Sequence, residues 1–172
     1  MMKIIFISGK AEHGKDTFAN ILKKEYITRN KRVLITHYGD LVKYVCRMFF
    51  NWDGEKNEPG RSLLQRIGTR FRSAIPTFWI DWIKSILQQF SDEWDVVLIP
   101  DCRFPNEVQE LVPSAHHYHI RIIRENYKSK LTPEQLQHPS ETALDDYPCD
   151  YKVINNTLEE LAETAKMIAD II

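Results

Sequence analysis

The sequence predicts an α/β domain in which helices cover both faces of a five-stranded, mainly parallel sheet. Short apolar runs alternate with helix-like amphipathic stretches along the chain, which is typical of parallel strands joined by right-handed crossovers. A glycine-containing loop joins the first apolar run to the first amphipathic stretch, and a later apolar run ends in a carboxylate. These observations predict three layers of helix, sheet and helix.

The composition is that of an ordinary single domain. The chain has 172 residues, a net charge of −1 and 43% hydrophobic residues, so it is long enough to bury a substantial core. Acidic and basic residues are interspersed, which gives no global reason to expect nucleic acid or an anionic membrane as a partner. No secretory signal or membrane-spanning run is recognisable and the three cysteines are far apart, so we expect a cytoplasmic protein with reduced thiols.

The first functional candidate is the loop at residues 9–17, Gly-Lys-Ala-Glu-His-Gly-Lys-Asp-Thr. It lies between a buried strand expected at residues 3–8 and a helix that opens at Asp16. Gly9 and Gly14 permit backbone angles that let successive N–H groups converge on phosphate oxygens, and Lys15 adds a positive charge at the start of the helix. The loop therefore predicts a polyphosphate-binding site, with a plain glycine turn as the alternative.

One position of this loop departs from the Walker A pattern. The residue after Lys15 is Asp16, where that pattern has Ser or Thr, and Thr17 follows. A carboxylate can approach Mg²⁺ directly or through water, although it places a negative charge near the phosphates.

The middle of the chain is mostly helical in pattern. After a strand at residues 32–38, helices are expected at residues 41–50, 61–74 and 77–90. Arg66 and Arg70 stand one turn apart in the second of these helices, and they indicate either a phosphate-binding role or a solvated basic face. Trp79 and Trp82 fit the apolar stripe of the third helix, and base stacking is the alternative to core packing.

A second strong signal is the apolar run at residues 95–101, which ends in Asp101 and has the form of a Walker B strand. Because the carboxyl ends of parallel strands share one edge of the sheet, Asp101 is expected near Lys15, where it could hold Mg²⁺ through water. A turn-forming Asp is the alternative. Arg103 follows two residues later, and an acid beside a base at a strand end suits phosphoryl chemistry.

The last third of the chain supplies two more strands. Residues 115–123 form one of them, in which His117 and His119 share a face and are either packing residues or a weak metal pair. Residues 125–150 are polar and contain three prolines, so a mobile segment over the phosphates is expected. A strand at residues 151–154 precedes a capping box at Thr157 and a final helix. Its expected inward residues are Leu158, Leu161, Ala165 and Ile168.

Five motifs in this order carry a resemblance. They are Gly14-Lys15-Asp16-Thr17, Leu64-Gln65 through Gly68-Thr69 with Trp79, Asp101-Cys102-Arg103, His138-Pro139-Ser140-Glu141, and residues 150–155 with the helix that follows. Over nearly its whole length the chain resembles the bacteriophage deoxynucleoside monophosphate kinases, a branch of the P-loop nucleoside monophosphate kinase superfamily. The resemblance implies a three-layer α/β/α P-loop NTPase fold. It also implies one kinase domain over residues 1–172, with a helical acceptor-binding insertion at residues 39–93 and a lid-like segment at residues 124–150.

The resemblance also implies roles for individual residues in ATP- and Mg²⁺-dependent transfer to a (deoxy)nucleoside monophosphate. The ATP-binding residues would be Gly9, His13, Gly14, Lys15, Asp16, Thr17 and Asn155. The metal residues would be Asp16, Thr17 and Asp101. The acceptor-binding residues would be Arg66, Arg70, Arg72, Trp79, Arg103 and Glu141. The catalytic residues would be Lys15, Arg103 and Arg124.

Two other functions stay open at this point. Animal-type phosphomevalonate kinases share the Gly-Lys-Asp loop and a stretch like Ser140-Glu141-Thr142-Ala143-Leu144-Asp145. The chain could also be a nucleotide-binding partner protein without kinase activity. We expect small-molecule nucleotides as partners rather than nucleic acid or a membrane, and the sequence leaves a homodimer open. If the chain is phage-encoded, its expected location is the cytoplasm of the host.

Overall fold

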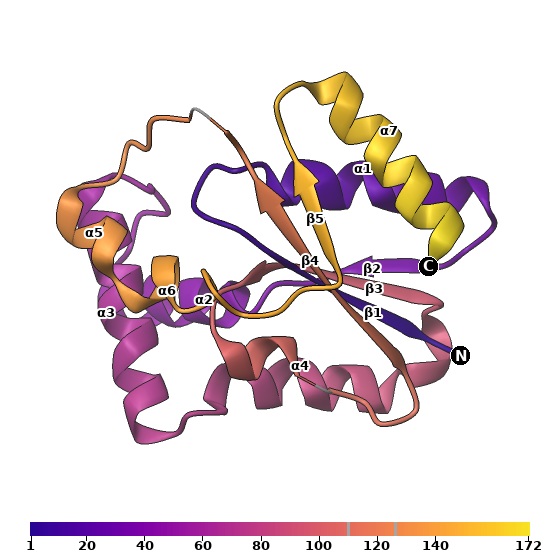
Figure 1. Cartoon of the computed structure of the whole chain (residues 1–172). Helices are drawn as coiled ribbons and strands as arrows, with labels where there is room; N and C mark the ends of the chain where they lie inside the picture. Colours follow the sequence, from indigo (N-terminus) through magenta and orange to yellow (C-terminus); the bar gives the residue numbers. More distant parts are fainter. Residues whose placement is uncertain (110, 126) are drawn as a thin grey trace.

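A computed structural model describes residues 1–109, 111–125 and 127–172, and its described residues form one five-stranded sheet (Figure 1). The strands are β1 (Lys3–Ser8), β2 (Val33–Ile35), β3 (Val96–Cys102), β4 (His116–Ile123) and β5 (Tyr151–Ile154). Their order in the sheet is β2-β3-β1-β4-β5, and each neighbouring pair is parallel. The predicted α/β class and strand number are confirmed.

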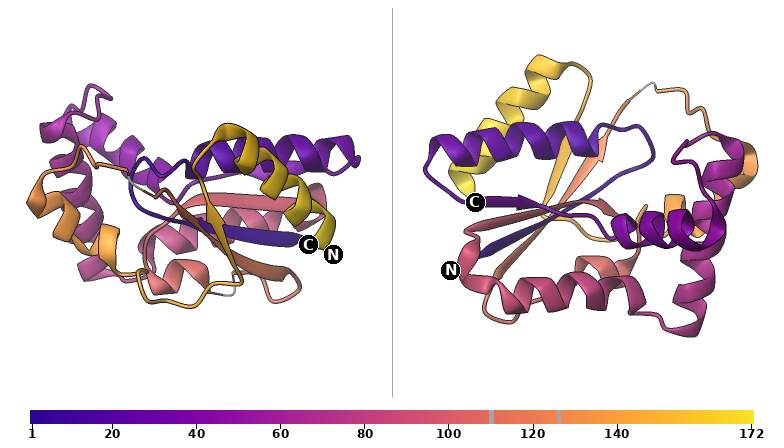
Figure 2. Two further views of the ribbon diagram at one scale, coloured as in Figure 1. Left: turned by 45° about the horizontal axis from the view of Figure 1, so that its top comes forward. Right: turned by 180° about the vertical axis from the view of Figure 1, so that it is seen from behind.

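Helices pack on both faces of this sheet (Figure 2). α1 (Lys15–Thr28) and α7 (Leu158–Ile171) cover one face, and α4 (Phe78–Gln89) covers the other. Side chains alternate along β1, so that Ile5 and Ile7 pack with the α1 and α7 residues while Ile4 and Phe6 pack with those of α4. The two resulting cores make the molecule a three-layer α/β/α structure.

The remaining helices gather at the carboxyl end of the strands (Figure 1). α2 (Gly39–Phe50) and α3 (Glu58–Ala74) share a small core of Cys46, Trp52 and Ile67. α5 (Pro133–Gln137), α6 (Pro139–Thr142) and the 3₁₀ turn η2 (Pro105–Val108) lie at the same end, and a further 3₁₀ turn, η1 (Ser91–Glu93), precedes β3. In a parallel sheet this is the edge at which ligands bind.

The segment at residues 125–150, in which the sequence shows little sustained periodicity, contains α5 and α6 in its described part. Each of these helices begins with a proline in its first turn, and each is too short to produce a periodic apolar pattern. Asn126 belongs to this segment and lies outside the described residues.

Helical spacing predicted the helices better than it predicted burial. Trp82 and Leu158 were expected to point inward, but they are 45% and 60% exposed. Leu161, Ala165 and Ile168 are buried as expected.

Three apolar residues of α2 are also exposed, namely Tyr44, Met48 and Phe49. This helix stands beyond the sheet, and little covers its outer side. Within the described ranges, no helix combines the length and apolar character needed to cross a bilayer.

Candidate functional site

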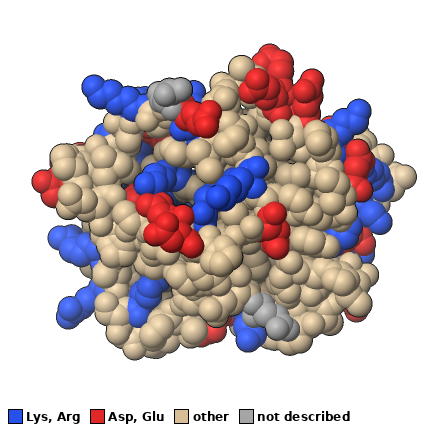
Figure 3. Space-filling model, in the orientation of Figure 1, with Lys and Arg blue, Asp and Glu red and all other residues tan. Residues whose placement is uncertain are grey.

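A cavity of about 730 Å³ opens where the loop before α1 faces α2, α3 and α6. Figure 3 shows a hollow in this side of the molecule, with basic and acidic side chains gathered around it. The cavity is lined by seven residues to which the resemblance assigns roles in the site, namely Lys15, Asp16, Arg72, Trp79, Asp101, Arg103 and Glu141. We call it the central cavity.

The loop has the backbone conformation that its glycines make accessible. Gly9 and Gly14 have φ values of 142° and 90°, in the left-handed region that side chains disfavour. A Cβ atom at Gly9 would lie 2.4 Å from the carbonyl oxygen of Ile122, and one at Gly14 would lie 2.3 Å from Nδ2 of Asn155. The same Asn155 amide donates a hydrogen bond of 2.9 Å to the carbonyl of His13, so the end of β5 supports the loop.

Lys15 is buried at the back of this loop, with 6% of its surface exposed. Its Nζ donates hydrogen bonds of 2.8 Å to the carbonyl oxygens of Gly9 and Lys10. Burial, and then the nearby charge of Arg103, lower the pKa of Lys15 to about 7. An anion placed in the loop would reverse this effect and favour the charged amine.

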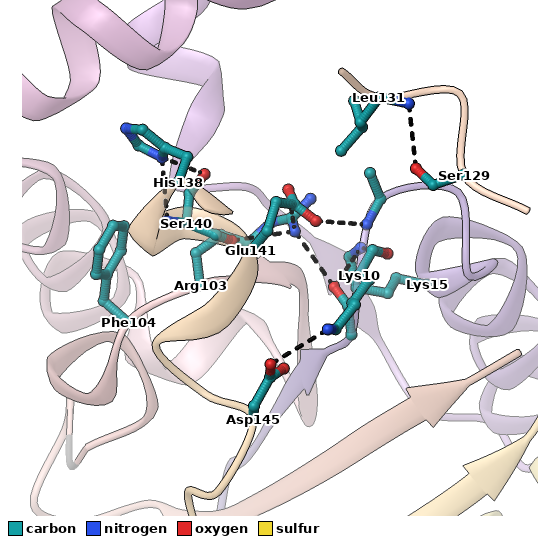
Figure 4. A network of polar contacts seen from close by, with 12 residues as sticks. Lys10, Lys15, Arg103, Phe104, Ser129, Leu131, His138, Ser140, Glu141 and Asp145 are labelled. Atoms are coloured by element: carbon teal, nitrogen blue, oxygen red, sulfur yellow. Dashed lines mark hydrogen bonds and ion pairs between the residues drawn. The ribbon is translucent and has the colours of Figure 1, made fainter. Parts of the chain in front are cut away.

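Arg103 approaches the loop from the end of β3 (Figure 4). Its Nη1 donates to the Gly9 carbonyl at 3.3 Å, to the Ser140 carbonyl at 3.2 Å and to Oε1 of Glu141 at 2.8 Å. The other carboxylate oxygen of Glu141 accepts a hydrogen bond of 2.9 Å from the backbone N–H of Ala11 in the loop. Glu141 is therefore bound by a guanidinium and a loop amide, two groups that typically bind anions.

Asp101 and Asp16 both line the central cavity. Both oxygens of Asp101 accept backbone hydrogen bonds at the start of α2, from Tyr38 at 3.0 Å and from Gly39 at 2.7 Å. Asp16 pairs with Nε2 of His37 at 2.8 Å, and this hydrogen bond lowers the pKa of Asp16. Burial opposes the charging of His37, but the hydrogen bond to Asp16 and the neighbouring carboxylates raise the pKa of that imidazole overall.

The carboxylates of Asp16 and Asp101 are suitable ligands for a magnesium ion that binds together with a polyphosphate. Within the part of the chain that the structure describes, no group of three or more His, Cys, Asp and Glu residues could hold a metal by itself. Mg²⁺ is commonly held by one or two carboxylates together with substrate phosphates, which matches Asp16 and Asp101 at the central cavity. Thr17 is exposed and lies outside the lining.

Arg72 and Trp79 form another wall of the central cavity. The guanidinium of Arg72 lies 3.8 Å from the ring centroid of Phe104 and donates to Oε1 of the buried Glu107 at 2.5 Å. Trp79 is almost fully buried, and its Nε1 donates to the Gly68 carbonyl at 3.1 Å. Of the two interpretations of this tryptophan, its packing matches a core residue that also borders the cavity.

Other predicted site residues lie away from this lining. Arg66 and Arg70 face a second cavity on a different side of α3. The Arg124 guanidinium lies 4.7 Å from the ring centroid of Tyr127, and its backbone N–H donates to Nδ1 of His13 at 3.2 Å. His117 and His119 share a face of β4, as alternation predicts, and have ordinary packing roles. His117 stacks on Phe6, while His119 bonds to the Ser8 hydroxyl and the Pro148 carbonyl.

Several polar residues of the site were not predicted. His37, Lys43, Lys56 and Arg61 line the central cavity. They come from α2, the start of α3 and the connections before these two helices, and none of them belongs to a motif that the sequence offered. Glu12 lies in the loop, and the sequence assigned it no role of its own. It has a φ of 63°, accepts a hydrogen bond from the Tyr127 hydroxyl and pairs with Nη2 of Arg61 at 3.4 Å.

Comparison with known proteins identifies the fold. No protein family and no curated protein matches the sequence. Among solved structures, the chain is similar to a sugar kinase from Janibacter sp., with a TM-score of 0.57 and 14% identity over 99% of this chain and 96% of that chain. It is also similar to the APS kinase CysC of Mycobacterium tuberculosis in complex with AMPPNP and APS, with a TM-score of 0.52 and 12% identity over 99% and 96%. At these identities the likeness shows a shared fold, that of P-loop kinases.

Proposed function

We propose that the chain is a kinase that transfers the γ-phosphoryl group of ATP to a (deoxy)nucleoside monophosphate. One observation carries the proposal: Lys15 and Arg103 bond to the same Gly9 carbonyl and line one cavity of about 730 Å³. A phosphate-binding loop and a second cationic group that line the same cavity are suited to binding a donor phosphate and an acceptor phosphate close together. The names of the similar structures, a sugar kinase and an APS kinase, support phosphoryl transfer to a small molecule.

The mechanism rests on charge neutralisation and alignment. An oxygen of the acceptor phosphate attacks the γ-phosphorus in line, so the site must hold two polyanions that repel each other. Lys15 and the loop amides would hold the ATP phosphates, and Arg103 would hold the acceptor phosphate. Asp16 and Asp101 would hold Mg²⁺, which when bound offsets charge on the triphosphate. A nucleotide phosphate is largely ionised near neutral pH, so no catalytic base is required.

Glu141 gives this mechanism a binding step. Its carboxylate accepts hydrogen bonds from Arg103 and the Ala11 amide, so the acceptor phosphate would compete with it for Arg103 and the ATP phosphates would compete with it for the loop amide. Displacing Glu141 would release α6 from the loop. We therefore assign the segment at residues 124–150 the role of a lid whose position responds to the acceptor, with Arg124 carried toward the phosphates on closure.

The test is an assay that couples ADP release to a detectable signal, run with Mg²⁺ and each of the four deoxynucleoside monophosphates. Stimulation by at least one of them, lost when EDTA removes the metal, is the expected result. Intact ATP binding with no stimulation of ADP release by any monophosphate would contradict the proposal.

A phosphomevalonate kinase is the second candidate. The contact that favours it is the placement of Ser140 and Glu141, from the stretch shared with those enzymes, directly on Arg103. Running the same assay with phosphomevalonate decides between the two acceptors.

A further inference from the structure

A second cavity, of about 750 Å³, lies against α3 and shares Gln65, Thr69 and His138 with the central cavity, while Arg66 and Arg70 line the second cavity alone. It is lined by Phe50 at the end of α2, His138 before α6, and the α3 residues Ser62, Gln65, Arg66, Ile67, Thr69, Arg70 and Ser73. We propose that this cavity binds a small phosphate-bearing molecule, independently of whatever occupies the central cavity.

The two arginines are the first reason. Arg66 and Arg70 are one helical turn apart and exposed, and no acidic side chain in the described ranges forms an ion pair with either. Two like charges at this spacing destabilise a helix unless an anion joins them. The neighbouring arginines of α3 are paired, Arg61 with Glu12 and Arg72 with Glu107, so the open pair is confined to the second cavity.

The rest of the lining matches a phosphorylated organic molecule. Guanidinium groups bind phosphate oxygens in pairs, and the hydroxyls of Ser62 and Thr69 offer further hydrogen bonds beside them. Phe50 is 46% exposed and provides an apolar ring on which a planar group could stack. Together these features describe a site for a nucleotide or a similar phosphate ester.

The size of the site and the charge of the whole molecule favour a small molecule over nucleic acid. A volume of about 750 Å³ falls within the usual range of small-molecule pockets, roughly 300–1,000 Å³. The net charge of −1 gives the whole molecule no general attraction for a polyanion.

His138 borders both cavities, as do Gln65 and Thr69 of α3. The Nε2 atom of His138 lies 3.3 Å from the Thr69 hydroxyl. Its Nδ1 lies 2.8 Å from the Ser140 hydroxyl, a contact that Figure 4 shows. Because Ser140 also contacts Arg103, the wall between the cavities is a hydrogen-bonded one. A ligand in one cavity could thus disturb residues of the other, so binding at each cavity must be measured on a residue that lines only that cavity.

The experiment follows the side-chain Nε–H signals of the arginines by NMR in the full chain, assigned with Arg66→Lys and Arg70→Lys variants. Inorganic phosphate, pyrophosphate and AMP are titrated in separate runs. We expect saturable shifts at Arg66 and Arg70, with a dissociation constant that differs from the one reported by Arg103. The double variant Arg66→Ala/Arg70→Ala should weaken this binding about tenfold or more. Lys24→Ala, an exposed lysine of α1, is the matched control and should leave the binding unchanged.

The three titrants distinguish the source of the phosphate. Tighter binding of AMP than of phosphate, lost in Phe50→Ala, would identify a nucleotide, and equal binding would identify the phosphate group alone as the ligand; both results support the site. Shifts that do not saturate would overturn the proposal. So would shifts that track Arg103 with one common constant, because the arginines would then report the central cavity. Saturable binding of a mixed-sequence oligonucleotide alone, falling steeply with salt, would replace the proposal with a nucleic-acid surface.

Discussion

Two cations meet at one backbone oxygen in the central cavity. Lys15 and Arg103 both donate to the Gly9 carbonyl, and Lys15 is buried while it does so. Holding two positive groups this close is unfavourable without an anion, and Arg103 contributes to the low pKa of Lys15. Glu141 supplies a negative charge to Arg103, and a polyphosphate would supply one to Lys15. The charge state of Lys15 should therefore depend on what the loop binds.

This dependence predicts proton uptake on nucleotide binding. With a pKa of about 7 in the free protein, Lys15 is mostly neutral at about pH 8 and mostly charged at about pH 6. Bound triphosphate raises the pKa, so binding at the higher pH should take up close to one proton and binding at the lower pH almost none. ATP affinity should accordingly fall as the pH rises above about 7. Calorimetry in buffers of different ionisation enthalpy measures the uptake, and Lys15→Met should remove it. Equal uptake by the variant would assign the proton to another group.

Arg103 should act chiefly on the acceptor. Arg103→Ala is expected to raise the KM for the monophosphate about tenfold or more and to change the KM for ATP little, since the loop amides and Lys15 hold the triphosphate. Arg103→Lys keeps the positive charge but loses the bidentate geometry of the guanidinium. Its KM for the monophosphate should therefore lie between the values of Arg103→Ala and the unchanged protein. Steady-state kinetics with each substrate varied in turn provide the readout. Unchanged acceptor kinetics in Arg103→Ala would show that this residue is misplaced in the mechanism.

At the scale of elements, Glu12 connects three of them. It belongs to the loop before α1, its carboxylate pairs with Arg61 of α3, and it accepts a hydrogen bond from Tyr127 in the segment after β4. The Tyr127 hydrogen bond lowers the pKa of Glu12, so the carboxylate is charged near neutral pH. Its backbone also adopts a left-handed conformation that a non-glycine residue disfavours. The contacts of the side chain offset that conformational cost.

A pair of substitutions distinguishes the cost of the backbone conformation at residue 12 from the contribution of the Glu12 side-chain contacts. Glu12→Ala and Glu12→Gly both remove the contacts, but only Ala keeps the cost of a positive φ. We expect Glu12→Gly to be about 1 kcal/mol more stable than Glu12→Ala, less any entropy that glycine adds to the unfolded chain. Urea unfolding of the two variants gives the difference. A more stable Ala variant would mean that the loop is not held in the left-handed conformation.

The start of α7 gives a stability prediction that the sequence already contained. Thr157 accepts a hydrogen bond of 3.2 Å from the backbone N–H of Glu160, as a helix cap does. Thr157→Ala should lower the free energy of unfolding by about 1 kcal/mol, and Thr157→Ser should keep most of the stability because it retains the hydroxyl. Chemical denaturation measures both. A serine variant as unstable as the alanine variant would assign the loss to the threonine methyl group instead.

Elements with strong local signals were predicted well, and those shaped by distant contacts were not. The strand at residues 151–154 is β5 as predicted, because its apolar pattern and flanking turns are local. The strand expected at residues 32–38 ends at Ile35 instead. Beyond that point the Tyr38 and Gly39 amides turn toward Asp101, and His37 turns toward Asp16. No local pattern could show that these partners would be within reach.

At the scale of the whole molecule, the central cavity takes residues from nearly every part of the chain. That Lys15, Asp101 and Arg103 lie together follows from parallel strands sharing one edge, so the sequence could predict it. The side of α3 that faces the cavity could not be predicted. Periodicity groups Arg66 with Arg70, but only the packing of α3 on α2 places Arg72 inside and that pair outside. Orientation of an amphipathic helix is a tertiary property, so periodicity alone could not tell which of these arginines line the central cavity.

The same dispersion of the site over the chain predicts how a ligand acts on overall stability. A molecule that binds only the folded chain stabilises it by mass action, so MgATP at about 100 times its dissociation constant should add about 2.7 kcal/mol. For a domain of this size each kcal/mol of added stability raises the Tm by about 2–4 °C, so MgATP should raise the Tm by roughly 5–11 °C. Because β1 and β3 contribute side chains to both sheet cores, the chain should unfold in one transition that moves as a whole. Lys15→Ala should shrink the increase, EDTA should reduce it, and Lys24→Ala should leave it intact. Thermal denaturation followed by circular dichroism tests this. A second transition that ATP does not move would divide the chain into independent units, with the site built on only one of them.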